Sequence, residues 1–515
     1  MLRSLLILLS ILLFCFNACQ HKTTSDPEDV VVASVGDRVI TVRDFRRNYE
    51  FGLPHLKKGP NRKRSYLDFM IKEMVLAQQG YKLDLDKSER VRKLERELQD
   101  ELLVEALFEH DVKDKIEIPD KEIRDAITKS KVQWKMRYWF EPNIDYAERV
   151  CQAMREHGYA EVVEDILRSN PEVNIKPKHL ESKYLTWLEV KPALLEIIED
   201  LPLGDISDPV EMDGGYFIFQ IVDIRREPLT EYDYQERAES YRQILFYRKL
   251  KEKASQYVSD FMTPKNVVTK GDVFRKLSNA LETWQAREED TREDFMQSIL
   301  SAQESDGPLY ELKTSLKHPL VTFQGGNWTV REFLERFDPN SLKTDKENGQ
   351  ADLRAALNQD IAIKVRDNFM VKEARKKNLQ RSPRLLLELK MWKDKWVYEE
   401  TRRYYTNDLK IDDKQAREYF EKYRDRFKIR WDDNPKFDEY VNQSRRLAYI
   451  HTARTRLTQK ADSLTNNAFP IIVHQAILDT ITTIEFRKSP WVSLQVFKGG
   501  SNRLASPIVD PAWGF

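Results

Sequence analysis

The chain has 515 residues, too many for one hydrophobic core, so several domains are expected. Basic and acidic residues number 85 each, and the formal net charge of +0 excludes a global positive field that would recruit nucleic acid or acidic lipid. A charged fraction of 33%, a mean hydropathy of −0.64 and only 16 Gly favour long solvated helices, and 11% aromatic residues exclude a disordered chain. The composition therefore predicts an ordered, elongated, mainly helical protein.

Residues 1–18 have the pattern of a targeting segment. Arg3 supplies a short positive region, and residues 5–16 are apolar over the length of a signal peptide, too short to span a membrane comfortably. Small Ala18 then precedes Cys19. An ordinary secretory signal and an uncleaved anchor are the alternatives.

The sequence around Cys19 resembles a bacterial lipobox, although Phe16 stands where that motif usually has Leu and Asn17 is also atypical. This resemblance implies a lipoprotein that begins at diacylated Cys19, with residues 19–29 as a polar tether to the membrane. Gln20 in place of Asp after the cysteine favours the outer membrane, by the rule for enteric bacteria.

After such processing the thiol of Cys19 is acylated and Cys151 is the one other cysteine left, so an intramolecular disulfide is excluded. It lies on a helical pattern beside Val150 and Met154, where a small core residue is expected. The 8 His are scattered, without metal-ligand spacing, and neither a phosphate-binding loop nor a nucleophile motif occurs. The sequence predicts no metal and no cofactor.

Residues 31–35 and 38–40 form two short β patterns, followed by a helical pattern over 42–51. Thr41 is placed as the helix N-cap, with Asp44 as the acidic half of a capping box. This opening resembles the chaperone module of SurA/PrsA-type foldases.

Helical periodicity continues over residues 65–80 and 87–115, and another helix starts at 118–122. The resemblance implies an N-terminal helical chaperone module over residues 30–130.

Residues 131–228 alternate strand and helix patterns: strands at 132–140, 184–188 and 216–222, helices at 144–157, 159–168 and 192–201, and a tight turn at 213–215. The last third resembles a parvulin-type prolyl isomerase domain. The matching residues are Leu201, Gly204, Asp205, Ile206, Ser207, Pro209, Val210, Gly215, Tyr216 and Ile218. This resemblance implies an α+β domain inserted in the helical scaffold.

Two histidines organise the polar network of parvulins, and their positions fall at Tyr138 and Phe217 here. Neither is histidine, so the resemblance predicts a degenerate domain whose isomerase activity is lost or weak. Aromatic side chains fill such a space at lower cost than a half-satisfied polar network, although they are also ordinary strand residues. The expected substrate-binding wall consists of Leu185, Trp187, Leu194 and Phe217.

Return helices are expected over residues 229–303, led by a long amphipathic helix at 230–262. The N-terminal opening then repeats, because Thr329 matches Thr41 and Asp413 matches Asp120 at nearly the same separation. The repeat predicts a second chaperone-like module over residues 304–430.

Residues 431–515 complete the chain as a helical region and a tail. Helices are expected at 443–464 and 468–479. Residues 491–515 are expected to form a loose tail. The alternative is that Trp513-Gly514-Phe515 is a peptide-like ligand for a partner.

The fold class expected is mainly α with an inserted parvulin-like domain. The function expected is a membrane-tethered periplasmic chaperone that holds unfolded secreted or outer-membrane proteins. An active prolyl isomerase and a structural lipoprotein that docks into an envelope assembly remain the alternatives.

Overall fold

The computed structural model describes residues 27–170, 175–288, 292–342, 349–428, 434–484, 504 and 506–514. The targeting segment and Cys19 lie outside the described residues. Contacts divide the chain into two units, residues 1–106 with 367–515 and residues 107–366. This grouping does not test the domain boundaries given above, which stay predictions.

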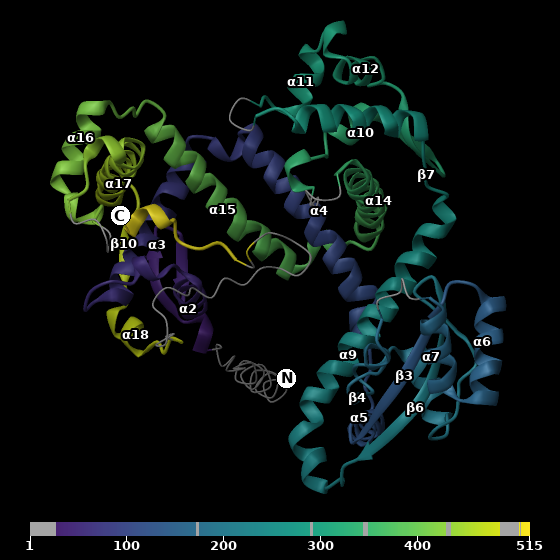
Figure 1. Ribbon diagram of the computed structural model, residues 1–515. Coiled ribbons are helices and arrows are strands. Elements are labelled where there is room, and N and C mark those ends of the chain that lie inside the picture. Colours follow the sequence, from purple (N-terminus) through teal and green to yellow (C-terminus); the bar gives the residue numbers. More distant parts are fainter. Residues whose placement is uncertain are drawn as a thin grey trace, which may run out of the picture. The chain divides into compact units, whose positions relative to one another are not determined.

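The first unit joins described residues from the N-terminal and C-terminal parts of the chain around one sheet, and Figure 1 shows its helices in purple and green to yellow. Its elements are β1 (Val31–Val35), β2 (Arg38–Thr41), α2 (Val42–Phe51), α3 (Arg62–Lys82), α15 (Pro383–Thr406), α16 (Asp413–Lys422), α17 (Val441–Asn467), β10 (Ile471–Val473), α18 (Gln475–Thr480) and η13 (Pro511–Gly514), with most of α4 (Glu89–Asp111) and the end of α14 (Gly349–Lys376).

The sheet of the first unit has the order β10-β1-β2, with both pairs antiparallel. Helices α3 and α15, from opposite halves of the chain, pack side by side, and a Cβ on Gly80 of α3 would lie 2.2 Å from Oγ1 of Thr401 on α15. Glycine is therefore what allows the two helices to approach so closely. Tyr66, Phe45 and Tyr398 are among the fully buried side chains of this core.

Two predictions for the C-terminal region are wrong. Residues 468–479 are not one helix: Pro470 precedes β10, whose β-branched residues pair with β1, and α18 begins only at Gln475. The described end of the chain, residues 506–514, is not a loose tail. Trp513 is 2% exposed and stacks on Phe69, at 6.2 Å between ring centroids.

The described residues of the second unit form two separate sheets. Its elements are α5 (Asp120–Lys129), β3 (Val132–Glu141), α6 (Ile144–His157), α7 (Tyr159–Ser169), β4 (Leu185–Thr186), α8 (Pro192–Asp200), β5 (Val210–Met212), β6 (Gly215–Arg226), α9 (Glu231–Met262), β7 (Val268–Thr269), α10 (Gly271–Gln285), α11 (Phe295–Ser301), α12 (Pro308–Thr314), β8 (Pro319–Phe323), β9 (Gly326–Thr329) and α13 (Val330–Leu334).

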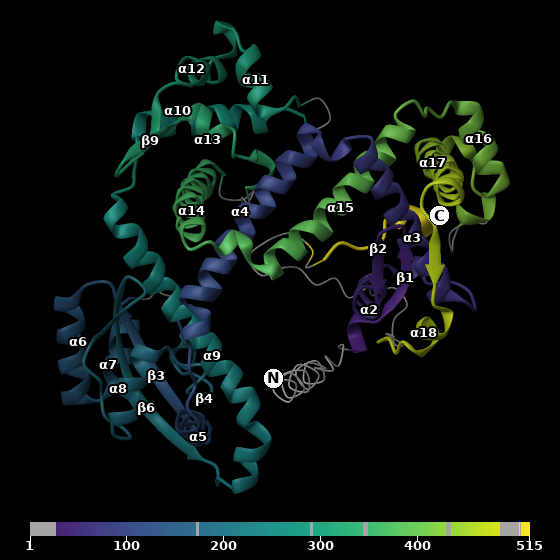
Figure 2. The ribbon, with the colours of Figure 1, turned by 180° about the vertical axis from the view of Figure 1, so that it is seen from behind.

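A four-stranded antiparallel sheet of order β4-β3-β6-β5 lies at the centre of residues 132–226. Helices α6 and α7 cover one face, and α5 and α9 lie on the other side, as Figures 1 and 2 show from opposite directions. The β5–β6 hairpin turns at Asp213 and Gly214, with φ of 52° and 80°. Both residues tolerate positive φ, so the turn predicted from the sequence is confirmed.

The repeated opening has the same local structure in both units. Thr41 caps α2 and Thr329 caps α13, each through a complete capping box that follows a two-stranded hairpin. A third strand pairs with the first strand of each hairpin, β10 with β1 and β7 with β8. The strands and caps of the second opening therefore match those of the first.

Candidate functional site

Tyr138 and Phe217, the positions predicted for the parvulin histidines, lie on one face of the four-stranded sheet. Tyr138 on β3 is opposite Phe219 on β6, and Phe140 is opposite Phe217. Side chains two residues apart on a strand share a face, so Tyr138 and Phe217 are diagonal neighbours. Their ring centroids are 6.4 Å apart.

Four aromatic rings make up this surface, which we call the aromatic face: Tyr138, Phe140, Phe217 and Phe219. Phe217 is at their centre, 5.0 Å from the ring of Phe140 and 6.0 Å from that of Phe219. Phe219 is buried, whereas Phe140 is 43% exposed. The aromatic face thus begins in the core and ends in solvent.

The aromatic face has one polar group, the hydroxyl of Tyr138, which donates to the backbone oxygen of His179 at 3.1 Å. Of its four side chains none is a carboxylate, an imidazole or a thiol. The face therefore offers mainly apolar ring surface. It can bind an apolar or prolyl side chain by contact.

The predicted wall residues belong to the same apolar cluster as Phe217 but differ in accessibility. Leu185 on β4 is opposite Trp134 on the sheet. Trp187 and Leu194 are 5% and 6% exposed, so neither offers much surface to a substrate. Their role as substrate-binding residues stays a prediction.

Trp187 is covered by α9. The guanidinium of Arg248 lies 4.4 Å from its ring and donates to its backbone oxygen, and Tyr241 stacks on it at 6.4 Å. Its buried indole N–H has no hydrogen-bond partner among the described residues. These contacts give Trp187 a structural explanation without a substrate.

Cys151 lies on α6, which packs against the opposite face of the sheet. The thiol donates to the backbone oxygen of Ser207 at 3.3 Å, and burial raises its pKa. Ser207 in turn bonds β6 through its backbone and its side chain, accepting from the N–H of Phe219 at 2.9 Å. The expectation that Cys151 is a small core residue is confirmed.

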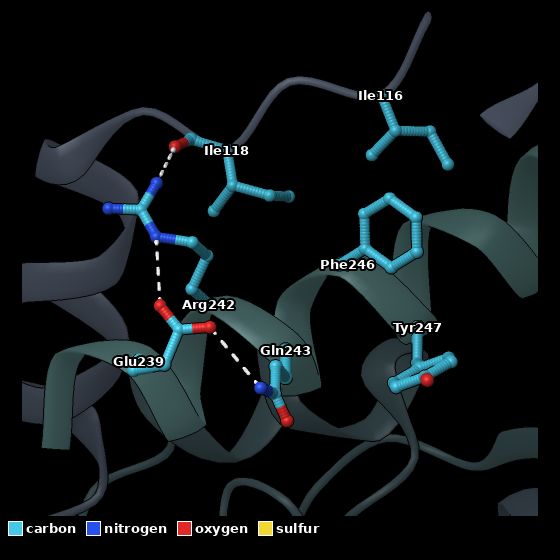
Figure 3. Close-up of a pocket in the computed structure, with 7 residues that line it drawn as sticks. All are labelled: Ile116, Ile118, Glu239, Arg242, Gln243, Phe246 and Tyr247. Carbon is cyan, nitrogen blue, oxygen red and sulfur yellow. Dashed lines mark hydrogen bonds and ion pairs between the residues drawn. The ribbon is translucent and has the colours of Figure 1, made fainter. Parts of the chain in front are cut away.

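A shallow groove of about 470 Å³ lies between residues 116–118 and α9. Figure 3 shows Ile116 above the ring of Phe246, with Ile118 to one side and Tyr247 below Phe246. Arg242 closes one end, where it donates to the oxygen of Ile118 at 3.4 Å. This groove presents two aliphatic and two aromatic side chains beside the polar side chains of Glu239, Arg242 and Gln243.

A second groove, of about 570 Å³, lies within the first unit. We call it the β2 groove; it is lined by residues 37–41, 506–509 and parts of α2, α3 and α15. No sequence pattern predicts this groove, because its walls come from distant parts of the chain. Among the described residues no group of His, Cys, Asp and Glu is arranged to hold a metal ion.

A network of charged residues holds the C-terminal segment at the β2 groove. Glu73 on α3 accepts from Lys395 at 2.8 Å and from the backbone N–H of Asp510 at 2.6 Å. The carboxylate of Asp510 bonds Tyr398 and Arg402. Burial raises the pKa of Glu73, and the nearby Lys395 opposes that rise.

Neither a protein-family model nor a curated protein matches the chain. Among solved structures, it is similar to one from Campylobacter jejuni, where PEB4 and Cj1289 are described as SurA-like chaperones. The identity is 16% and the TM-score 0.21, over 47% of this chain and 100% of the other.

It is also similar to the peptidylprolyl isomerase PrsA of Bacillus anthracis, at 13% identity and a TM-score of 0.21 over 36% of this chain and 94% of that one. For PrsA of Bacillus cereus the identity is 15% and the TM-score 0.22, over 44% and 86%. These solved structures are thus SurA-like and PrsA proteins.

Proposed function

We propose that the protein is a chaperone of the parvulin-type foldase class that binds unfolded envelope polypeptides and has lost its isomerase activity. Residues 131–228 form its parvulin-like domain, inserted between helical modules at 30–130 and 304–430. Binding occurs through apolar and aromatic surface, with many weak contacts that release the client readily.

The aromatic face is the observation that carries this proposal. Isomerisation requires the resonance of the X-Pro amide to be relieved, and only groups that favour the twisted amide over the planar one accelerate it. Tyr138 and Phe217 place rings where the parvulin histidines are expected, and the hydroxyl of Tyr138 is already bonded to the oxygen of His179. Apolar contact remains available there, whereas the polar network is replaced.

The first test measures two activities of the mature chain from residue 20. Isomerisation of a short X-Pro peptide is expected at the uncatalysed rate, while aggregation of an unfolded outer-membrane protein is expected to be suppressed at stoichiometric concentration. The variant Tyr138→His/Phe217→His is the comparison for the first assay and Phe140→Ala for the second.

Catalysis by the native sequence would replace this proposal with the active isomerase. Absence of both activities, together with one stoichiometric envelope partner in a pull-down, would support a structural lipoprotein instead. Retained folding of each variant is checked by circular dichroism.

We also infer a lipid anchor on Cys19 facing the periplasm, in the outer membrane. The support is the sequence motif alone. Among the described residues, no helix is long and apolar enough to cross a membrane. Mass spectrometry of the mature N-terminus tests the anchor: diacylglyceryl and acyl masses on residue 19 are expected, and Cys19→Ser should move the protein out of the membrane fraction.

A further inference from the structure

Strand β2 is at the outer edge of the sheet in the first unit, because the strand order is β10-β1-β2. Backbone bonds from His474 to Val32 and from Gly36 to Pro470 show which residues of β1 face β10. In an antiparallel ladder the backbone groups of successive residues point to opposite sides. Ala33 and Val35 therefore face β2.

Val39 is the residue of β2 whose backbone faces outward. Ala33 is opposite Ile40, and Val35 is opposite Arg38. Ile40 and Arg38 of β2 therefore use their backbone groups in hydrogen bonds to β1. Val39, opposite Ser34, directs its N–H and C=O to the free edge, where no partner is found among the described residues. Such an edge is a template for another strand.

The β2 groove runs along this edge. Residues 37–41 form one wall, and α3, α15 and residues 506–509 form the others. Met70, Met74 and Met391 line it, and methionine side chains adapt to differently shaped apolar partners. Because walls from α15 and the C-terminal segment flank the edge, it has room for a single extended strand rather than for the edge of a folded sheet.

The charges of the groove divide into paired and unpaired groups. Arg38 pairs with Asp394 at 2.5 Å, and Lys395 pairs with Glu73 at 2.8 Å. Three exposed charged side chains that line the groove have no partner among the described residues: Arg47, Lys390 and Asp37. The two cations outnumber the one anion, so the unpaired charge is net positive and complements an acidic residue of a bound segment.

A buried hydroxyl beside the groove lacks a hydrogen-bond partner. Ser506 lines the groove and is 5% exposed, and its Oγ has no partner among the described residues. A buried hydroxyl without a partner costs free energy, so a small movement that brought it to a bound polar group would be favourable.

We propose that the β2 groove binds an extended segment of unfolded polypeptide as an added strand on β2. The backbone of the segment pairs with Val39, its aliphatic side chains contact the methionines, and an acidic side chain lies near Arg47 and Lys390. This inference rests on the proposed function and names the place where a client binds, in a unit separate from the aromatic face.

The test uses fluorescence anisotropy of a labelled peptide of alternating Val and Thr with Asp at each end, added to the mature chain. The variant Val39→Pro removes the outward N–H and leaves the β1–β2 ladder bonds in place. It is expected to weaken binding about tenfold, since it removes one backbone hydrogen bond and restricts the edge. Val39→Thr, which keeps the N–H and the shape, is expected to bind as the native chain does.

A second peptide, N-methylated at its central amides, carries the same side chains but lacks the backbone N–H donors at those positions. The native chain is expected to bind it about tenfold more weakly, for the same reason. Lys390→Glu should weaken binding of the acidic peptide and reduce its dependence on salt. The thermal unfolding of each variant is the control for folding.

Equal affinity of the native chain and Val39→Pro for both peptides would overturn the inference. So would a dimer of the chain that forms with rising concentration and is lost in Val39→Pro, because β2 would then pair with a second copy. If aggregation is still suppressed in either case, the proposed function stands and only this site fails. If the native chain binds neither peptide nor unfolded client, both fail.

Discussion

The indole N–H of Trp513 donates to the carboxylate of Glu73 at 3.1 Å, although 440 positions separate the two residues in the chain. The same carboxylate accepts from Lys395 on α15 and from the backbone of Asp510. Glu73 therefore joins α3, α15 and the C-terminal segment at one point, and it maintains one wall of the β2 groove.

Replacing Glu73 by Ala should destabilise the first unit by about 3 kcal/mol, because it leaves the ammonium of Lys395 without its partner in a largely buried place. Hydrogen exchange of residues 506–514 should accelerate together with the loss of stability. Glu97→Ala on α4, whose pair with Lys93 is exposed, is the matched control and should cost under about 0.5 kcal/mol. Equal effects of the two substitutions would show that the network does not hold the segment.

Trp513→Ala should cost about 3 kcal/mol of unfolding free energy, the usual range for a buried large aromatic side chain. Trp513→Phe keeps an aromatic ring against Phe69 but loses the bond to Glu73 and part of the buried ring volume, so its cost should be smaller, about 2 kcal/mol. Denaturant unfolding measures both variants. If Trp513→Ala left the free energy of unfolding unchanged, the C-terminal segment would be detached in solution.

The long helices could be predicted because their periodicity is local. Residues 42–51 and 144–157 were expected as helices, and α2 and α6 have these bounds. The position of Trp513 could not be predicted, since its partners Phe69 and Glu73 lie in the other half of the chain. Strand β10 was missed for the same reason, because three residues form a strand there only by pairing with β1.

The candidate site was predictable only in part. The resemblance placed Tyr138 and Phe217 together, and the register places them on one face. It did not include Phe140 and Phe219, which become neighbours through that register. The β2 groove has no sequence signal, because an edge strand is defined by what does not pair with it.

The two capping boxes provide a test of the repeat. Thr41→Ala and Thr329→Ala each remove the hydroxyl that accepts from the N–H of Asp44 or Glu332, so each should cost about 1 kcal/mol. The first should lower the unfolding temperature of one unit and the second that of the other, measured by calorimetry. Thr→Ser at either position keeps the cap and should cost only a few tenths of a kcal/mol. One shared transition, shifted equally by both, would contradict two independently unfolding units.

Gly215 allows Phe140 to lie over the start of β6. A Cβ at this position would be 2.4 Å from the ring of Phe140 and 2.9 Å from the backbone oxygen of Glu141. Gly215→Ala should therefore displace the ring and cost about 2 kcal/mol. Adding Phe140→Ala should recover part of that loss, and the coupling is read from a double-mutant cycle. If the costs of Gly215→Ala and Phe140→Ala simply added, the ring of Phe140 would not occupy this position in solution.

Asp233 at the start of α9 gives the second unit an acid-dependent stability. Its carboxylate pairs with Lys131 at 2.8 Å and caps the helix through Thr230. The hydrogen bond from Lys131, followed by those from Thr230, holds the pKa of Asp233 well below its ordinary value of 3.8. Because the folded pKa is the lower one, this stabilisation is complete above the unfolded value, about pH 4, and is lost as the pH falls towards the folded value.

Asp233→Asn should therefore lower the free energy of unfolding at pH 7. It should also make that free energy fall less steeply as the pH is lowered below about 4. Denaturant unfolding between about pH 2 and pH 7 measures both effects. Lys131→Met removes the larger cause of the lowered pKa of Asp233 and leaves the hydrogen bonds from Thr230. The pH dependence of the unfolding free energy should therefore be reduced only in part. If the unfolding free energies of the native chain and of Asp233→Asn fell in parallel below about pH 4, the carboxylate of Asp233 would not be the group whose protonation destabilises the unit.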